Sequence, residues 1–144
     1  YMRPIRKYRE KGSDFRRIEG FNSRIRKLHE ERWGANRSDE FYSYLEYMNR
    51  NDLSRSYGLY LDDKLISYVQ VIMTGNTGHY YYSIFDTDYD GAGSAIINYA
   101  LKEALDSKKL RYFSYGRGSE VFKHRWCTDI FKNYRLRGFL EEPF

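Results

Sequence analysis

Two short stretches of the sequence combine glycines with residue types that bind anions. In the first, Gly91 and Gly93 are separated by one alanine and followed by Ser94. Glycines let backbone amides approach a phosphate closely, and Ser94 is suited to cap a following helix. Three carboxylates come just before it, at Asp86, Asp88 and Asp90. They would repel a pyrophosphate unless they face away from it. A flexible turn followed by a helix cap would show the same pattern.

The second stretch is more basic. Arg117, Lys123 and Arg125 place permanent or strong positive charge around a predicted strand-to-helix turn, with Ser119 as the expected helix cap. This cluster is a candidate anion site. Glu120, in the same turn, is the candidate general base, although a glutamate in the first turn of a helix is also a favourable partner for the helix dipole. A solvated cationic helix would have the same composition.

The apolar spacing predicts helices at five places along the chain. They are a helical remnant before Gly12, two helices over 22–33 and 38–49, a helix built on Ile97, Ala100, Leu101, Ala104 and Leu105, and a short helix over 119–126. The helix built on Ile97 is the clearest, because its apolar residues follow the i, i+3, i+4, i+7, i+8 pattern. Asn22 or Ser23 is the expected N-cap of the helix over 22–33.

Runs rich in Tyr, Ile and Val predict strands between these helices. They are an edge strand over 14–19, an antiparallel meander over 57–61, 64–74 and 79–85, a strand over 110–115 and a last strand around 131–139. Both alternating sets of side chains are apolar in 64–74, so both faces of that strand should be covered. The helix between 79–85 and 110–115 forms a crossover that should lay these strands parallel.

Both glycine-containing stretches therefore follow parallel strands and precede helices. Ligands favour this position in α/β sheets, because helix N-termini and unpaired amides point out of the strand ends there. The fold class is α/β, with a mixed central sheet and helices on both faces. The length of 144 residues and the 41% hydrophobic content predict a single domain over 1–144. Its first residue is Tyr and it begins in mid-pattern, so we expect a fragment of a longer protein with a partner domain on its N-terminal side.

Charge and cysteine content narrow the classes of protein further. The net charge is +5, with basic residues crowded into the first seventeen positions, where they would attract polyanions or form a solvated surface. The only cysteine, Cys127, excludes an internal disulfide, and the histidines are not at zinc-ligand spacing. We therefore expect no metal. No apolar run is long enough to span a membrane and no signal-peptide core is present, so we expect a cytoplasmic domain.

Residues 112–126, YFSYGRGSEVFKHRW, resemble a known family signature. They are similar to the F-D-F-G-R-G-D-E-P-Y-K-R-R-W pattern of the CelD/BcsL-type acetyltransferase domain, which belongs to the GNAT superfamily. The passage LYLDDKLISY over 59–68 also resembles that family's L-x-L-D-G-x-x-I-A, so the likeness covers nearly the whole chain. The pair Phe122 and Lys123 is similar to the F-K pair of the related Fem-type aminoacyl transferases.

The resemblance implies the GNAT acyl-CoA N-acyltransferase fold and an acyl group carried by acetyl-CoA or another acyl-CoA. The acceptor would be an amine or hydroxyl of a small molecule, glycan or peptide, in cell-envelope or exopolysaccharide metabolism. Gly91, Gly93, Ser94, Arg117 and Arg125 would then contact the cofactor. Lys123 would hold a phosphate or the developing oxyanion beside Glu120, and backbone amides near 81–85, on a splayed fourth strand, could stabilise that oxyanion as well.

Two departures from the signature keep other functions open. Phe122 replaces a tyrosine whose phenol could have protonated the leaving thiolate, and Ser119 replaces an acidic residue. A catalytically silent GNAT-fold binding module is one alternative. A Fem-like transferase is another, and it would take tRNA as the acyl carrier. Nucleic-acid binding through the basic surface ranks last, because no recognised binding pattern is present, so we expect no other nucleic-acid partner.

Overall fold

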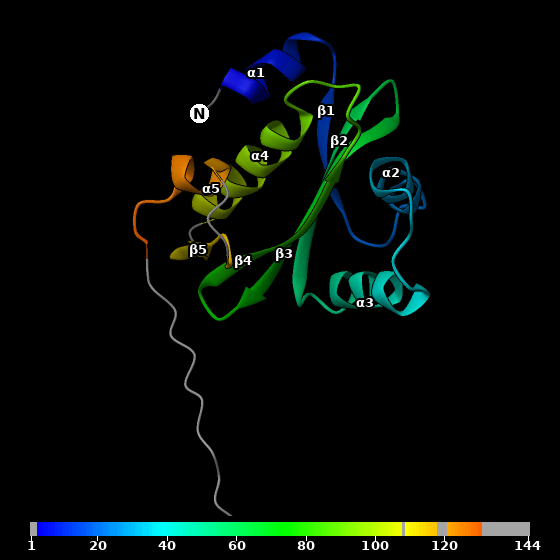
Figure 1. The fold of residues 1–144 in the computed structure, drawn as a ribbon. Helices are drawn as coiled ribbons and strands as arrows, with labels where there is room; N and C mark the ends of the chain where they lie inside the picture. The colour runs from blue at the N-terminus through cyan, green and yellow to red at the C-terminus, as the bar shows by residue number, and fades with distance from the viewer. Residues whose placement is uncertain (1–2, 108, 118–120, 131–144) are drawn as a thin grey trace, which may run out of the picture.

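The computed structural model describes residues 3–107, 109–117 and 121–130, which form one sheet flanked by helices (Figure 1). The strands are β1 (Asp14–Ile18), β2 (Ser54–Leu61), β3 (Lys64–Thr74), β4 (Thr77–Phe85) and β5 (Tyr112–Ser114). The helices are α1 (Arg3–Glu10), α2 (Arg24–Trp33), α3 (Asp39–Arg50), α4 (Ala92–Asp106) and α5 (Val121–Trp126). The strand predicted around 131–139 lies outside the described residues.

The strands lie side by side in chain order, β1-β2-β3-β4-β5. The first four are antiparallel to their neighbours, and β5 is parallel to β4, to which α4 connects it. The predicted mixed sheet with a meander and a strand-helix-strand crossover is therefore confirmed. The predicted helix over 22–33 begins at Arg24, whose amide donates to the Asn22 side chain at 2.9 Å.

Helices cover both faces of the sheet, as the apolar sequence of β3 predicts (Figure 1). Ile66 and Val69 pack in a core with α1 and α4. Leu65 and Tyr68 pack in a second core with α2 and α3 on the other face. The central strand is thus buried on both sides, as its apolar residues on both faces require.

Two details of the α4–β5 region differ from the sequence prediction. The strand predicted over 110–115 is shortened to β5. Where β5 begins, the amides of Arg111 and Tyr112 both donate to the carbonyl of Asn76 in the β3–β4 turn, at 2.7 and 3.2 Å. Gly116, with φ of 72°, then turns the chain away. Leu105 is 66% exposed although it belongs to the predicted stripe. It lies eight residues after Ile97, which rotates it by about 80° from Ile97, on the side away from buried Ala100 and Ala104.

A buried polar network joins α3 to the sheet. The Asn49 side-chain oxygen accepts hydrogen bonds from Ser54 Oγ at 2.7 Å, Ser56 Oγ at 2.8 Å and Gln70 Nε2 at 3.3 Å. Its amide nitrogen donates to the carbonyl of Gly20 at 3.2 Å. The network satisfies polar groups that would be costly to bury alone, and it holds α3 in place beside β2 and β3.

We expect Asn49→Leu to lower the free energy of unfolding by about 2–4 kcal/mol, because the substitution removes an acceptor that three buried donors share and leaves the Gly20 carbonyl without its donor. Urea denaturation monitored by circular dichroism would measure the change. Asn51→Ala is the matched control, since the Asn51 side chain is exposed and donates to the nearby Tyr47 carbonyl at 2.8 Å. Equal stability of the two variants would contradict a structural role for the network.

Candidate active site

The sheet opens between β4 and β5. β5 pairs only with the first residues of β4, in the register Thr77 to Tyr112, Gly78 to Phe113 and His79 to Ser114. Beyond this point, the β4 edge over 80–85 has no strand beside it on the β5 side in the described part of the chain. Such an edge leaves amides and carbonyls available to a ligand. The predicted splay beside the fourth strand is therefore present.

A β-bulge lies where this open edge begins. Tyr82 pairs with Gln70 and Tyr80 pairs with Val71, so Tyr81 is the extra residue on β4. A bulge bends its strand and redirects the local backbone groups, and bulges are frequent beside active sites. No sequence pattern marks the bulge, because three tyrosines follow one another over 80–82.

The first glycine-containing stretch forms the start of α4. Gly91 occupies the N-cap position with φ of 79°, and its carbonyl accepts the amide of Ala95 at 2.9 Å. The predicted cap, Ser94, instead lies inside the first turn, because the left-handed cap conformation favours glycine. The amides of Gly93 and Ser94 precede the first α-helical hydrogen bond, so they are free of intrahelical acceptors. A β-carbon on Gly93 would lie 2.6 Å from the Phe85 ring, so glycine lets α4 start close against β4.

The carboxylates before this turn are largely neutralised. Asp86 is buried and lies 3.2 Å from both Arg24 Nη2 and Lys64 Nζ. The Asp90 carboxylate lies 3.2 Å from Lys7 Nζ. Two of the three acidic side chains are thus committed to cations, which lowers the repulsion that a phosphate at Gly91 would meet.

The second glycine-containing stretch lies at the other end of the open edge. A β-carbon on Gly116 would lie 3.9 Å from the carbonyl of Tyr80, whereas Gly93 contacts Phe85. These positions are about 16 Å apart along an extended strand. Lys123, on α5, donates a hydrogen bond to the carbonyl of Arg117, so the structure brings these two predicted residues together. Glu120 and the side chain of Arg125 lie outside the described residues.

Aromatic and basic residues that were not predicted as site residues face β4 from α2 and α3. His29 Nδ1 and the Tyr82 hydroxyl are 2.9 Å apart, and the Phe41 ring packs 5.3 Å from that of Tyr82. Burial, followed by the charge of Arg37, lowers the pKa of His29, and burial raises the pKa of Tyr82. Both shifts favour a neutral imidazole whose Nδ1 accepts a hydrogen bond from the protonated Tyr82 hydroxyl. Arg32 lies 4.0 Å above the Phe85 ring, at the end of the open edge.

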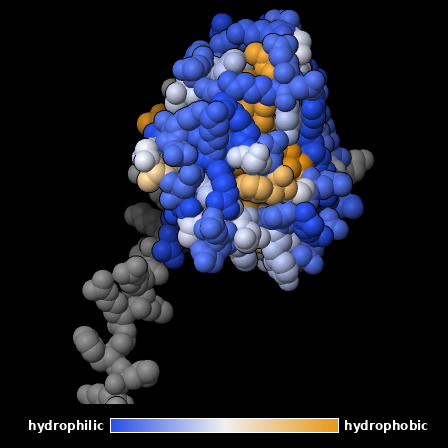
Figure 2. Space-filling view, turned by 90° about the vertical axis from the view of Figure 1, so that its right-hand side faces the viewer, coloured by the Kyte–Doolittle hydropathy of each residue, from blue (hydrophilic) through white to orange (hydrophobic). Residues whose placement is uncertain are grey.

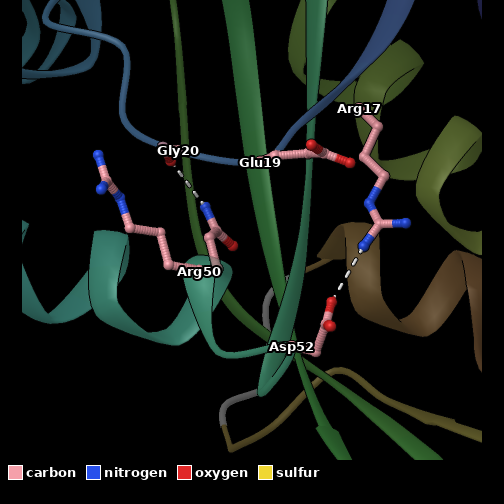
Figure 3. Close-up of a pocket in the computed structure, with 6 residues that line it drawn as sticks. Arg17, Glu19, Gly20, Arg50 and Asp52 are labelled. Carbon is pink, nitrogen blue, oxygen red and sulfur yellow. Dashed lines mark hydrogen bonds and ion pairs between the residues drawn. The ribbon is translucent and has the colours of Figure 1, made fainter.

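A separate hollow of about 460 Å³ lies away from this site, where β1 ends and α3 leads into β2 (Figure 3). It is lined by Arg17, Glu19, Gly20, Asn49, Arg50 and Asp52. Arg17 and Asp52 pair across it at 3.4 Å, and Asn49 binds the Gly20 carbonyl. Its charged groups are satisfied by one another in part, and none of the residues predicted to do chemistry lies there.

The α2 and α3 side of the molecule is mainly hydrophilic, and apolar side chains show only in a narrow strip (Figure 2). No helix within the described ranges has the length and apolar character needed to cross a membrane. Among the same residues, no group of three or more His, Cys, Asp or Glu side chains is placed to hold a metal ion.

Residues 1–124 match the family model of the acetyltransferase (GNAT) domain. The chain therefore belongs to the GNAT acetyltransferases, and the predicted superfamily and fold class are confirmed. It is an acetyltransferase domain whose open β4 edge corresponds to the splayed strand that the resemblance implied. A search of the curated proteins finds no matching relative.

Several solved structures share the fold at low sequence identity. An aminoglycoside acetyltransferase from an uncultured soil metagenomic sample superimposes with a TM-score of 0.62 at 11% identity, covering 90% of this chain and 97% of its own. The ribosomal-protein-alanine N-acetyltransferase of Brucella melitensis gives 0.57 at 16% identity, covering 88% and 99%. A GNAT family acetyltransferase of Staphylococcus aureus gives 0.59 at 10% identity, covering 87% and 98%.

Proposed function

We propose that the chain transfers an acyl group from acetyl-CoA or another acyl-CoA to an amine or hydroxyl acceptor. The observation that carries this proposal is the open edge of β4, with an amide-rich helix start at one end and a backbone bulge at the other. The donor pyrophosphate would bind the amides of Gly91, Gly93 and Ser94. Its extended arm would follow 80–85, so that the thioester lies beside the bulge at Tyr81.

The chemistry requires a deprotonated nucleophile and fixed donors for the negative charge that develops on the carbonyl oxygen. Backbone amides at the bulge are suited to the second role. Lys123 lies at the Gly116 end of the open edge, which favours its action on the oxyanion over binding of the pyrophosphate about 16 Å away. Arg117 and Arg125 would add positive charge around the donor, and Glu120 remains our proposed general base.

The acceptor is proposed from the CelD/BcsL-type resemblance to be a glycan, peptide or small molecule of cell-envelope or exopolysaccharide metabolism. The structural relatives do not choose among these classes, because one is named for aminoglycosides and another for a ribosomal protein. We also propose that 1–144 forms one acyltransferase domain, which would work in the cytoplasm.

A Fem-like reaction, with the acyl group carried by tRNA, is the second candidate. The specific observation in its favour is the basic helix α1, which packs against α4 beside the glycine turn and would suit a larger polyanion. The pair Phe122 and Lys123 points the same way. A silent module that only binds a ligand is the third candidate, because Phe122 removes the phenol of the family signature.

Calorimetric titration with acetyl-CoA and free CoA, together with a transfer assay, tests the proposal. We expect saturable binding by the wild type. Lys123→Ala should lower the transfer rate by about 100-fold, as for loss of an oxyanion donor, and change the CoA dissociation constant by less than about threefold. Lys102→Ala is the control, since Lys102 pairs with Asp106 on the surface of α4.

Failure of the wild type to bind either ligand would contradict the acyl-CoA proposal and favour the tRNA-dependent or silent alternatives. Binding without any transfer, in both wild type and Lys123→Ala, would favour the silent module. A loss of CoA affinity in Lys123→Ala as large as its loss of rate would place Lys123 on the phosphate instead of the oxyanion.

A further inference from the structure

Helix α1 holds the turn that precedes α4. The Tyr8 side chain is only 1% exposed, and its hydroxyl donates a hydrogen bond to the main-chain carbonyl of Asp90 at 2.8 Å. Lys7 Nζ donates to the same carbonyl at 3.3 Å and lies 3.2 Å from the Asp90 carboxylate. Figure 1 shows α1 over the end of α4 at which that helix begins. Two adjacent residues of α1 thus hydrogen-bond to Asp90, the residue before Gly91.

The bond from Tyr8 fixes the orientation of the peptide that joins Asp90 to Gly91. A trans peptide is planar, and its carbonyl and amide point in opposite directions. When the Asp90 carbonyl is held toward α1, the Gly91 amide must point away from α1. The neighbouring backbone is fixed as well, because the Ala92 amide donates to the Tyr89 carbonyl at 3.1 Å. The Gly91 amide is therefore preset before any ligand binds.

Lys7 changes the charge at the same place. Asp90 immediately precedes the N-cap of α4, where an unpaired carboxylate would oppose a bound phosphate. The contact with Lys7 offsets that charge. Both side chains are exposed enough to be screened by salt, so this contribution should depend on ionic strength, whereas the buried Tyr8 bond should not.

We propose that Tyr8 and Lys7 are positioning residues for the donor pyrophosphate. Tyr8 orients the Asp90–Gly91 peptide so that its amide faces the phosphate, and Lys7 neutralises the Asp90 carboxylate. This inference rests on the proposed use of an acyl-CoA donor. It gives α1 a role in the site, although the helix lies more than eighty residues earlier in the sequence.

The test compares Tyr8→Phe with Tyr42→Phe by calorimetric titration with CoA. Both tyrosines are 1% exposed, and the Tyr42 hydroxyl donates a hydrogen bond to the Asn36 side chain at 3.1 Å, on the α2–α3 side. Loss of one hydrogen bond in Tyr8→Phe should raise the CoA dissociation constant about fivefold to tenfold. Tyr42→Phe should leave it within about twofold of the wild type.

A truncated donor separates positioning from general damage. S-acetyl-pantetheine carries the thioester but no pyrophosphate, so Tyr8→Phe should transfer its acetyl group at the wild-type rate. Lys7→Met, a change on the exposed surface, should raise the CoA dissociation constant about threefold at low salt and less at 0.5 M salt, about where the screening length has halved. The Tyr8→Phe effect should persist at both salt concentrations.

An unchanged CoA dissociation constant in Tyr8→Phe would overturn the inference while leaving the proposed function intact. Equal losses with CoA and S-acetyl-pantetheine would also overturn it, because they would indicate a general disturbance of the fold. If the wild type itself does not bind CoA, the proposed function fails first and this inference fails with it. The CoA titrations and the transfer assay with S-acetyl-pantetheine together distinguish these three outcomes.

Discussion

Gly93→Ala should weaken CoA binding by about 100-fold, because even a methyl group at this position forces the start of α4 away from β4. The β-carbon would lie 2.6 Å from the Phe85 ring, well inside contact distance. The amides of Gly93 and Ser94 would move with the helix and would no longer be positioned to donate hydrogen bonds to the pyrophosphate. Overpacking should also lower the free energy of unfolding by about 1–3 kcal/mol. Calorimetric titration and urea denaturation measure the two effects separately.

Two further variants separate the steric effect from other consequences. In Gly93→Ala/Phe85→Ala, the clashing ring is removed, so CoA affinity should recover toward that of Phe85→Ala alone. In Gly91→Ala, nothing lies within 4 Å of the new methyl group and only the left-handed φ of 79° is strained, so affinity should fall less than about tenfold. Wild-type affinity in Gly93→Ala would show that the donor does not bind at the start of α4.

The course of the chain through the sheet was predictable because local patterns agreed with one another. Apolar runs broken by Asp62 and Gly75 defined the meander, and the apolar character of both faces of β3 correctly predicted a covered strand. The helix built on Ile97 and Ala100 was predicted with its crossover. The boundaries of β5 were not predicted, because it begins where the amides of Arg111 and Tyr112 bind the β3–β4 turn, a long-range contact that periodicity does not report.

The site was predictable only in part, for the same reason. The cofactor-binding role of Gly91 and Gly93 stays a prediction, whereas the predicted cap role of Ser94 was wrong, because Gly91 takes the N-cap position. The bulge at Tyr81 depends on the pairing register with β3. The contact of Tyr8 with Asp90 depends on packing between distant helices. Neither leaves a signal in a single sequence, because each arises only after the sheet and its layers have formed.

Asp86→Ala should give the largest loss of stability, about 3–5 kcal/mol, because it breaks a buried ion pair from one side. Asp86 is 8% exposed and lies 3.2 Å from Arg24 Nη2, whose side chain is 19% exposed. Arg24 Nε is buried without a hydrogen-bond partner among the described residues. The guanidinium is therefore incompletely hydrogen-bonded even with Asp86 present. Without Asp86 it would keep Glu31, at 3.4 Å. Urea denaturation measures the change, and exposed Asp88→Ala is the control.

The double variant Asp86→Ala/Arg24→Met decides whether the loss arises from the stranded charge. Removing Arg24 as well should recover at least half of the stability, because replacing both members of a buried pair by apolar groups is far less costly than removing one. We also expect Asp86→Ala to weaken CoA binding, because the Asp86 side chain accepts the Asp88 amide at 3.2 Å and so shapes the turn before Gly91. This loss of affinity should persist in the double variant. Recovery of both stability and CoA affinity in the double variant would mean that the unpaired Arg24 charge, and not loss of the Asp88 contact, weakens CoA binding in Asp86→Ala.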